Sequence, residues 1–218
     1  MSWSAILAEL DRKRAFAQGM GGDARLAKQH GSGKLDARQR AALLFDDGAF
    51  VEIGGLAANL SESSAQPAPA DGLVAGFGLV NGRPVVAGIE DFTVLGGSIG
   101  DAGAAKRQRL AHLAGQERVP LIFMLEGAGH RLTNAHATPA PNDLQALAEL
   151  SGRVPMLCLV LGASAGHGAM TAPLSDFVVM TEAAQLFVAG PPIVKAAIGE
   201  TVTKEQLGGP QVHVGVSG

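Results

Sequence analysis

The sequence predicts an α/β protein in which parallel strands alternate with helices. Two copies of one unit lie 35 residues apart: Arg-Val-Pro at 118–120 opens the apolar run LIFMLE, and Arg-Val-Pro at 153–155 opens MLCLVL. Each run ends in a glycine-rich turn followed by a helical pattern, as in neighbouring parallel strands covered by helices. Asn81-Gly82, between the apolar stretches 73–80 and 84–90, predicts a hairpin, because a type I′ turn needs positive φ at both central residues.

Helical periodicity and capping residues predict the other elements. Three helices are expected over 4–18, 23–29 and 36–44, the last with Asp36 as its N-cap. We therefore expect a helical N-terminal arm over 1–48 and one domain over 49–218. The run SESSAQPAPA at 61–70 is expected to be a loop. The remaining predicted elements are a helix over 101–115, strands over 177–181 and 185–189, and a helix that opens at Pro191-Pro192.

Composition and charge exclude several classes of protein. The chain has 218 residues, a formal net charge of −3, 30 glycines and a single cysteine, Cys158. One cysteine excludes an internal disulfide, a four-cysteine zinc ribbon and a C-x-x-C redox pair, and it fits a reducing compartment. The near-neutral balance, with no basic stripe interleaved with aromatics, argues against nucleic acid as a partner. No signal-peptide pattern and no apolar run of about 18 residues occurs, so we expect no membrane segment and a cytoplasmic location.

The residues that could carry chemistry gather in two turns that follow the repeated strands, EGAGHR at 126–131 and GASAGHG at 162–168. Open α/β sheets bind ligands at that edge, where glycine permits close backbone approach and a helix N-terminus offers unpaired N–H groups. The alternative is that these glycines only make tight turns and close helix packing. Backbone donors with few side-chain catalysts suit stabilisation of an enolate or a tetrahedral oxyanion.

Two histidines stand in these turns. His130 and His167 each follow a glycine and could act as acid and base, although loop histidines are more often surface or hydrogen-bonding residues. The histidines of the chain show no metal-ligand spacing, so no metal is expected.

The charged side chains near the turns have less specific interpretations. Glu126 is a candidate base, but a carboxylate that caps a helix or braces a loop is the commoner case. The basic cluster at 106–109 (KRQR) is expected on a solvated helix face, with contact to a ligand phosphate as the alternative. Glu90 and Asp91 are adjacent, so on a strand they face opposite ways and form no carboxylate pair.

A nucleophilic serine is a further alternative. The sequence G-x-S-x-G at 162–166 matches a nucleophile elbow, and Ser164, Asp176 and His213 stand in the required order. Asp176 follows the serine by only twelve residues, which leaves no room for the intervening strand of a hydrolase. Other motifs fail, because Leu132 replaces the third glycine of a dinucleotide fingerprint and no P-loop occurs.

Longer motifs make the sequence recognisable. In this order, KQHGSGKLDARQRAALLFDDGAFVE, DFTVLGGSIGDAGAAK, EGAGHR, GASAGHGAM, SDFVVM and AGPPIVKAAIGETVTKEQLGG resemble the carboxyltransferase (beta) component of biotin-dependent acyl-CoA carboxylases, the propionyl-, acetyl- and methylcrotonyl-CoA carboxylase group. The resemblance runs from about residue 5 to residue 218 and corresponds to the N-terminal half of such a subunit. It implies a crotonase-like fold, a superhelix of ββα units.

The resemblance also implies the reaction and its cofactor, biotin. Carboxybiotin on a partner carrier domain would release CO2, the freed biotin nitrogen would help to take the α-proton of an acyl-CoA, and the enolate would attack CO2. The protein would then supply backbone N–H groups rather than a side-chain base, and it would need no metal.

Site residues follow from the resemblance position by position. The implied catalytic positions are Ala128, Gly129, Gly166, His167 and Gly168. The implied substrate-binding positions are Gly96, Gly97, Ser98, Gly127, His130, Arg131 and Ala165, with Phe92 at the start of the same F-x-x-x-G-G-S loop. The chain departs from the family pattern where Ala128 replaces a glycine, His130 and His167 replace small residues, and Glu126 replaces an aspartate. The Cβ that alanine adds at residue 128 narrows the pocket, so the resemblance does not determine which acyl group the substrate carries.

Partners follow from the domain organisation of the family. Its members usually carry a second crotonase-like domain, and their site forms between the N-domain of one protomer and the C-domain of another. The resemblance therefore implies an acyl-CoA substrate, a biotin carboxylase or biotin carboxyl carrier subunit, and either a homo-oligomer or a complementary chain that carries the C-domain. The alternative from a different class is a non-catalytic acyl-CoA-binding or assembly subunit.

Overall fold

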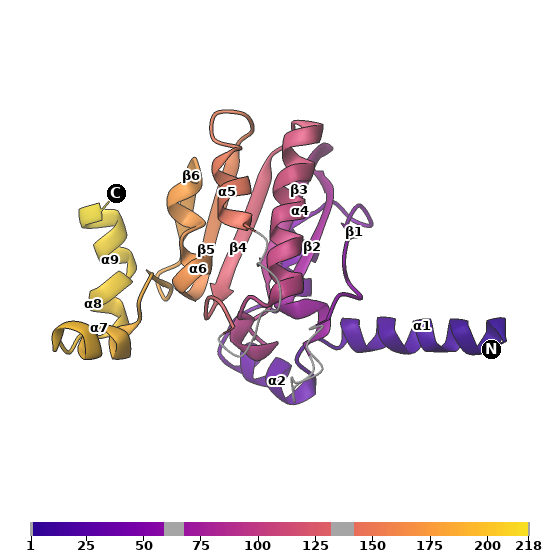
Figure 1. Ribbon diagram of the computed structural model, residues 1–218, viewed down its shortest axis with the longest axis horizontal. Coiled ribbons are helices and arrows are strands. Elements are labelled where there is room, and N and C mark those ends of the chain that lie inside the picture. The colour runs from indigo at the N-terminus through magenta and orange to yellow at the C-terminus, as the bar shows by residue number, and fades with distance from the viewer. Residues whose placement is uncertain (1, 59–67, 132–141, 218) are drawn as a thin grey trace.

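A computed structural model describes residues 2–58, 68–131 and 142–217 of the chain and shows a mixed α/β fold (Figure 1). Within these ranges one seven-stranded sheet has the order β1-β2-β3-β4-β5-β6, with β7 also paired to β5. Pairs among the first three strands are antiparallel, and the later pairs are parallel. The strands are β1 Val51–Glu52, β2 Leu73–Val80, β3 Arg83–Glu90, β4 Leu121–Gly127, β5 Met156–Ala165, β6 Phe177–Met180 and β7 Gln185–Phe187.

The hairpin predicted from Asn81-Gly82 is confirmed. β2 and β3 pair antiparallel along their whole length, from Leu73 opposite Glu90 to the turn. Asn81 and Gly82 both have positive φ, 50° and 74°, as the turn requires. Asp46 accepts both turn amides at 2.8 Å, which ties the loop after the N-terminal helices to this end of the sheet.

The internal repeat is confirmed as a pair of parallel neighbours. Leu121 of β4 lies opposite Met156 of β5, and the register continues residue by residue to Leu125 opposite Val160. Residues that correspond in the repeat are therefore partners in the sheet. As a result, the two glycine-rich turns leave the sheet at the same edge.

Helices occur close to where the sequence predicts them. Asp36 caps its helix with a full capping box that includes Gln39, a stabilising arrangement at a helix start. Of the predicted loop at 61–70, only residues 68–70 lie within the described ranges. A 3-10 turn, Pro69–Gly72, begins there. The α-helices are α1 Trp3–Gln18, α2 Asp23–Gly31, α3 Ala37–Leu44, α4 Asp101–Glu117, α5 Asp143–Ala148, α6 Gly166–Ala169, α7 Pro191–Ile198, α8 Lys204–Gly208 and α9 Pro210–Val212.

Strand alternation produces two apolar layers, one on each face of the sheet. Leu121, Phe123 and Leu125 of β4 face α4 and α5, in a core with Leu110 and Leu147. The residues between them, Ile122 and Met124, belong to clusters on the other face, with members from the N-terminal arm: Met20, Ala37, Ala41 and Phe45. Alternate side chains of a strand point to opposite faces, so one strand serves both cores.

The N-terminal arm is helical, as predicted, but its parts differ in packing. α1 projects away from the sheet (Figure 1), and Trp3 at its start is 80% exposed. α3 packs on the sheet through Ala37 and Ala41, and α2 contributes the buried Gln29. The boundary at residue 48 stays a prediction, since α2 and α3 contribute to the same packed body as the strands.

The last helices lie beyond the edge strand β6 (Figure 1). The helix predicted to open at Pro191-Pro192 is α7, and none of its residues is buried. Among the described residues, no helix is long and apolar enough to cross a bilayer, and no group of three or more histidine, cysteine, aspartate or glutamate side chains could hold a metal ion.

Candidate active site

Three glycine-containing segments meet at the edge of the sheet where β4 and β5 end. A Cβ placed on Gly129 would lie 2.8 Å from the Ala165 carbonyl oxygen and 3.2 Å from the Gly166 Cα, so the two predicted turns touch through their backbones. A Cβ on Gly127 would lie 2.5 Å from the Gly97 oxygen, which places the third segment, 96–98, against the first turn. Only glycine permits such close contact.

The backbone amides of the first turn divide into one that is used and one that is available. Ala128 N–H donates to the Gly96 oxygen at 3.0 Å. That donor therefore holds the 96–98 loop in this structure, and the implied role of the Ala128 amide as an oxyanion donor stays a prediction. Gly129, with φ of 80°, donates its N–H to no group within the described ranges. Gly129 is buried, and its amide is the one that the proposed function below uses.

The Arg131 guanidinium is hydrogen-bonded within the protein. Its Nη1 lies 2.6 Å from Asp71 Oδ1, its Nη2 donates to the Ser98 oxygen at 2.9 Å, and its Nε donates to Ser98 Oγ at 3.2 Å. The side chain is 7% exposed. Asp71 and Ser98 bind the guanidinium and so fix the glycine loop, and the implied contact between Arg131 and substrate stays a prediction. Phe92, by contrast, is 41% exposed.

Glu126 braces the N-terminal helices against the sheet. Its buried carboxylate accepts Lys34 Nζ at 2.7 Å and Gln29 Nε2 at 3.1 Å, and it pairs with Arg40. Three donors from the arm therefore meet one strand end. This favours the bracing interpretation over a base, because both carboxylate oxygens are already bound by these donors.

The basic cluster on α4 is not solvated as predicted. Arg109 is exposed, but Lys106 and Arg107 face the sheet and are 6% and 1% exposed. Lys106 Nζ donates to the Ala70 oxygen at 2.7 Å and to the Leu73 oxygen, and burial lowers the pKa of Lys106 to about 8. The helix lies along the sheet, so two of its three basic residues are packed.

Arg107 pairs with two buried carboxylates, those of Asp143 and Glu90. Its Nε donates to Asp143 Oδ2 at 2.6 Å, and its Nη1 lies 3.4 Å from Glu90 Oε1. Burial raises the pKa of Glu90, although Arg107 and the Glu126 N–H oppose the change. Glu90 also accepts the Glu126 amide at 2.8 Å, whereas Asp91, which follows the last residue of β3, accepts the Thr93 N–H at 3.0 Å.

His167 is held by Asp143. Its Nε2 lies 2.6 Å from Asp143 Oδ1, and its side chain is 20% exposed while the carboxylate is fully buried. Burial alone would raise the pKa of Asp143, but the hydrogen bond from His167 and the Arg107 charge lower it to about 2. An ionised carboxylate only accepts hydrogen bonds, so the proton of this bond is on Nε2. The His130 ring packs against His167 with centroids 4.2 Å apart.

The structure contradicts a serine triad. Ser164 Oγ is buried and has no hydrogen-bond partner among the described residues. Asp176 accepts the Met156 N–H at 2.7 Å, at the other end of the ten-residue strand β5, roughly 26 Å away at about 3.3 Å per residue. His213 is engaged by the Leu186 oxygen at 2.8 Å. The three residues cannot act together.

Two residues of the site carry no signal in the sequence analysis. Asp143 follows Asn142 at the start of a helix, where acidic residues are common for capping reasons alone. Asp71 lies in the 3-10 turn before β2 and has a positive φ of 48°. Their cationic partners, Arg107 and Arg131, are 36 and 60 residues away in sequence, so only the fold shows the pairing.

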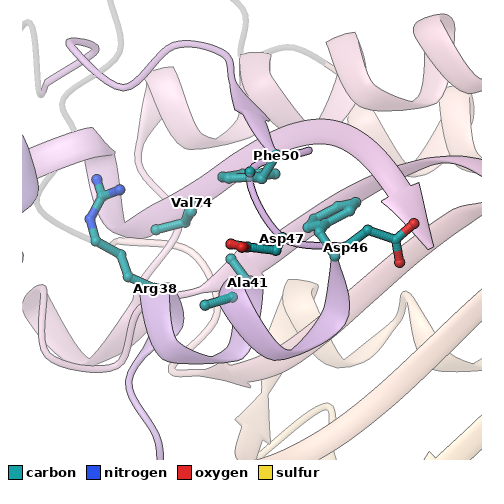
Figure 2. Close-up of a pocket in the computed structure, with 9 residues that line it drawn as sticks. Arg38, Ala41, Asp46, Asp47, Phe50 and Val74 are labelled. Carbon is teal, nitrogen blue, oxygen red and sulfur yellow. The ribbon is translucent and has the colours of Figure 1, made fainter. Parts of the chain in front are cut away.

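A pocket beside the N-terminal arm is separate from these turns. A pocket of about 220 Å³ lies between α3, the following loop and β2 (Figure 2). Its lining includes Arg38, Asp47, Phe50 and Val74, and it shares no residue with the predicted site. Phe45 and Phe50 stack there with ring centroids 4.8 Å apart. In the glycine turns, Gly127 and Gly129 are buried, and Gly166 and His167 are half-buried.

Comparison with known proteins decides the family. Residues 28–218 match the family model described as carboxyl transferase domain. The chain belongs to this family. It is 37% identical over 213 residues to methylmalonyl-CoA decarboxylase subunit alpha of Propionigenium modestum, and 34% identical over 215 residues to the methylmalonyl-CoA carboxyltransferase 12S subunit of Propionibacterium freudenreichii subsp. shermanii. These matches cover 95% and 96% of this chain but 41% of each relative.

Solved structures agree with the family assignment. The transcarboxylase 12S crystal structure, with methylmalonyl-coenzyme A and methylmalonic acid bound, superposes with a TM-score of 0.87 at 32% identity and covers all of this chain and 44% of that chain. The beta subunit of geranyl-CoA carboxylase from P. aeruginosa gives a TM-score of 0.75 at 29% identity, covering 99% and 39%. The family resemblance read from the sequence motifs is confirmed. The carboxyltransferase-family domain thus spans about two fifths of its curated relatives.

Proposed function

We propose that this chain is the acyl-CoA-binding, enolate-stabilising part of a biotin-dependent acyl-CoA carboxyltransferase. The observation that carries the proposal is the contact between the Gly129 turn and Gly166, which places two backbone segments with amide donors at one edge of a parallel sheet. In the proposed reaction, CO2 passes from carboxybiotin to the α-carbon of an acyl-CoA.

The residues of this chain would act on the thioester. Gly129 N–H would donate to the thioester oxygen, whose negative charge grows as the enolate forms, and one such donor is worth about 3 to 4 kcal/mol. The amides of Gly166, His167 and Gly168 open α6, where the first N–H groups of a helix have no intrahelical partner. Arg131 would hold the 96–98 loop in place through Ser98.

The fold is consistent with a crotonase-like arrangement, which we include in the proposal. β2 and β3 form a hairpin followed by α4, a ββα unit. β4 and β5 each lead into a glycine turn at the same edge. A superhelix of such units would align successive turns along one side of the molecule.

The pockets found among the described residues do not place a chamber for biotin beside the glycine turns. The cavity beside Glu90, Ser98 and Arg107 is about 10 Å³, roughly the space of a single water, and the pockets of about 220 and 330 Å³ lie under α3 and between α4 and α5. When bound, carboxybiotin would supply CO2 and a proton acceptor. It would be carried by a partner, and no residue of this chain is assigned to it.

The relatives suggest the substrate class and partners. The two curated relatives described above are named for methylmalonyl-CoA, so we propose a short-chain acyl-CoA. The 12S structure is described as a hexamer assembly, and we propose that this chain also works in an oligomer with biotin carboxylase, carrier and complementary carboxyltransferase chains in the cytoplasm.

A non-catalytic assembly role is the second candidate, and exposed apolar side chains favour it. Phe177 on β6 is 62% exposed, and Ile193 and Ile198 on α7 are 60% and 67% exposed. Large exposed apolar patches commonly mark interaction surfaces. Both candidates predict association, which sedimentation at micromolar concentration would reveal.

Titration calorimetry with CoA thioesters separates the two candidates. The carboxyltransferase proposal predicts that propionyl-CoA binds more tightly than free CoA. An intact fold without detectable thioester binding would support the assembly role. Carboxyl transfer from free carboxybiotin is expected only after addition of the complementary chain, and turnover by this chain alone at ordinary enzyme rates would contradict the proposal.

A further inference from the structure

We infer that His167 acts as a proton acceptor for the α-carbon of the bound acyl-CoA, so that this chain exchanges the α-hydrogens of the thioester with solvent without biotin. The inference rests on the proposed function, because it needs an acyl-CoA at the glycine turns. It adds a side-chain activity to a site whose proposed chemistry otherwise uses backbone donors.

The first argument is the geometry of the Asp143 and His167 pair. Asp143 Oδ1 holds Nε2–H of His167 at 2.6 Å, and Arg107 Nε holds the other carboxylate oxygen at 2.6 Å. A buried carboxylate that fixes one imidazole nitrogen sets the tautomer and leaves the other nitrogen as a lone-pair base. Here that nitrogen is Nδ1, which has no hydrogen-bond partner within the described ranges. Asp143 is therefore a positioning residue.

The second argument is the place of the imidazole in the site. His167 directly follows Gly166, whose backbone touches Gly129. The His130 ring, from the first turn, lies 4.2 Å from the His167 ring. The α-carbon of a thioester is two bonds from its oxygen, so a substrate whose oxygen accepts Gly129 N–H carries its α-hydrogens next to these turns.

The exchange step balances without a further reactant. His167 Nδ1 takes the α-proton, the electron pair of the C–H bond moves to the thioester oxygen as the enolate forms, and Gly129 N–H stabilises that oxygen. The imidazolium then loses its proton to water, gains a deuteron in D2O and returns it to the α-carbon. No bond to CO2 forms, and nothing is oxidised or reduced.

The test uses the full chain with propionyl-CoA in D2O, and mass spectrometry measures deuterium at the α-carbon. His167→Gln is the key variant, because its amide N–H can still donate to Asp143 while the base is gone. We expect exchange to fall about 100-fold, as for loss of a general base, with calorimetric affinity for propionyl-CoA unchanged within twofold. His112→Gln, on the exposed side of α4, is the matched control and should exchange at the wild-type rate.

The outcomes separate this inference from the proposed function. Wild-type binding with no exchange above buffer would overturn the role of His167 and leave the binding proposal intact. If the wild-type chain does not bind propionyl-CoA, both the role of His167 and the proposed function are overturned. Exchange reduced less than threefold in folded His167→Gln would also overturn the inference. If that variant unfolds, Asp143→Asn is the second test. It should lower exchange at least tenfold while propionyl-CoA still binds.

Discussion

Ala128 N–H donates to the Gly96 carbonyl oxygen at 3.0 Å, so the first amide after β4 closes a loop and is not free for a ligand. The next amide, that of Gly129, has no partner in the described part of the chain. Substitutions at these two residues should therefore have different effects.

Ala128→Gly should leave ligand binding nearly unchanged. The N–H to Gly96 stays, and the lost Cβ belongs to an exposed residue. An added glycine costs about 0.5 to 1 kcal/mol in the free energy of unfolding, and the affinity for propionyl-CoA should stay within twofold by calorimetry. A tenfold loss of affinity would mean that the alanine methyl contacts the ligand.

Arg131→Met should reduce stability more than it reduces intrinsic affinity. It leaves the buried Asp71 without its cation, and removal of one partner from a buried ion pair costs about 3 to 5 kcal/mol. Urea unfolding measures this loss, and Arg131→Lys should recover only part of it because lysine lacks the planar fork that reaches Ser98. Wild-type stability combined with abolished CoA binding would identify Arg131 as a direct ligand contact instead.

Glu126→Gln should loosen the N-terminal helices first. The substitution leaves Arg40, which is 5% exposed, and Lys34 without their common counter-charge, at a cost of about 3 kcal/mol. Hydrogen exchange should show lost protection in α2 and α3 before the strands. The control is Arg38→Gln, which breaks the less buried pair with Glu52 and should cost less. Uniform loss of protection over the whole sheet would contradict this bracing role.

Asp143 and Glu90 should give opposite pH dependences although both face Arg107. The pKa of Asp143 is about 2 in the folded protein, below its ordinary 3.8, so its contribution of about 2 kcal/mol is present above pH 4 and is lost as pH falls towards 2. The pKa of Glu90 is raised above 4.5 by burial, so stability falls as pH rises above 4.5. Urea unfolding of Asp143→Asn and Glu90→Gln against pH checks both signs, and parallel curves would contradict them.

Much of the fold follows from local sequence signals. The 35-residue repeat gives the register between β4 and β5, because corresponding residues such as Leu121 and Met156 are partners. Asn81-Gly82 determines the hairpin through positive φ, and Asp36 starts α3 through its cap. These features depend on neighbours in sequence, so they can be read without the fold.

Which charged residues are buried, and which groups they pair with, could not be predicted from the sequence in the same way. In the sequence, Lys106 and Arg107 look like residues of a solvated helix face. Their burial depends on acceptors from distant segments, such as Asp143 and the Leu73 carbonyl. Similarly, the glycine motif indicates an oxyanion site, but only the fold shows that the Ala128 N–H already donates to the Gly96 carbonyl oxygen. Long-range packing decides which donors remain.

The most direct test of the central claim replaces the Gly129 N–H by oxygen, through incorporation of glycolic acid at residue 129. A proline would not serve, because its φ near −65° is incompatible with the observed 80°. Calorimetry then compares propionyl-CoA with its S-propyl thioether, which lacks the carbonyl acceptor. We predict that the wild type and His130→Ala bind the thioester about tenfold more tightly, since an unmet buried donor costs about 1 to 3 kcal/mol, and that the ester variant binds the two ligands equally. Loss of the preference in His130→Ala, with the ester variant unchanged, would contradict the account.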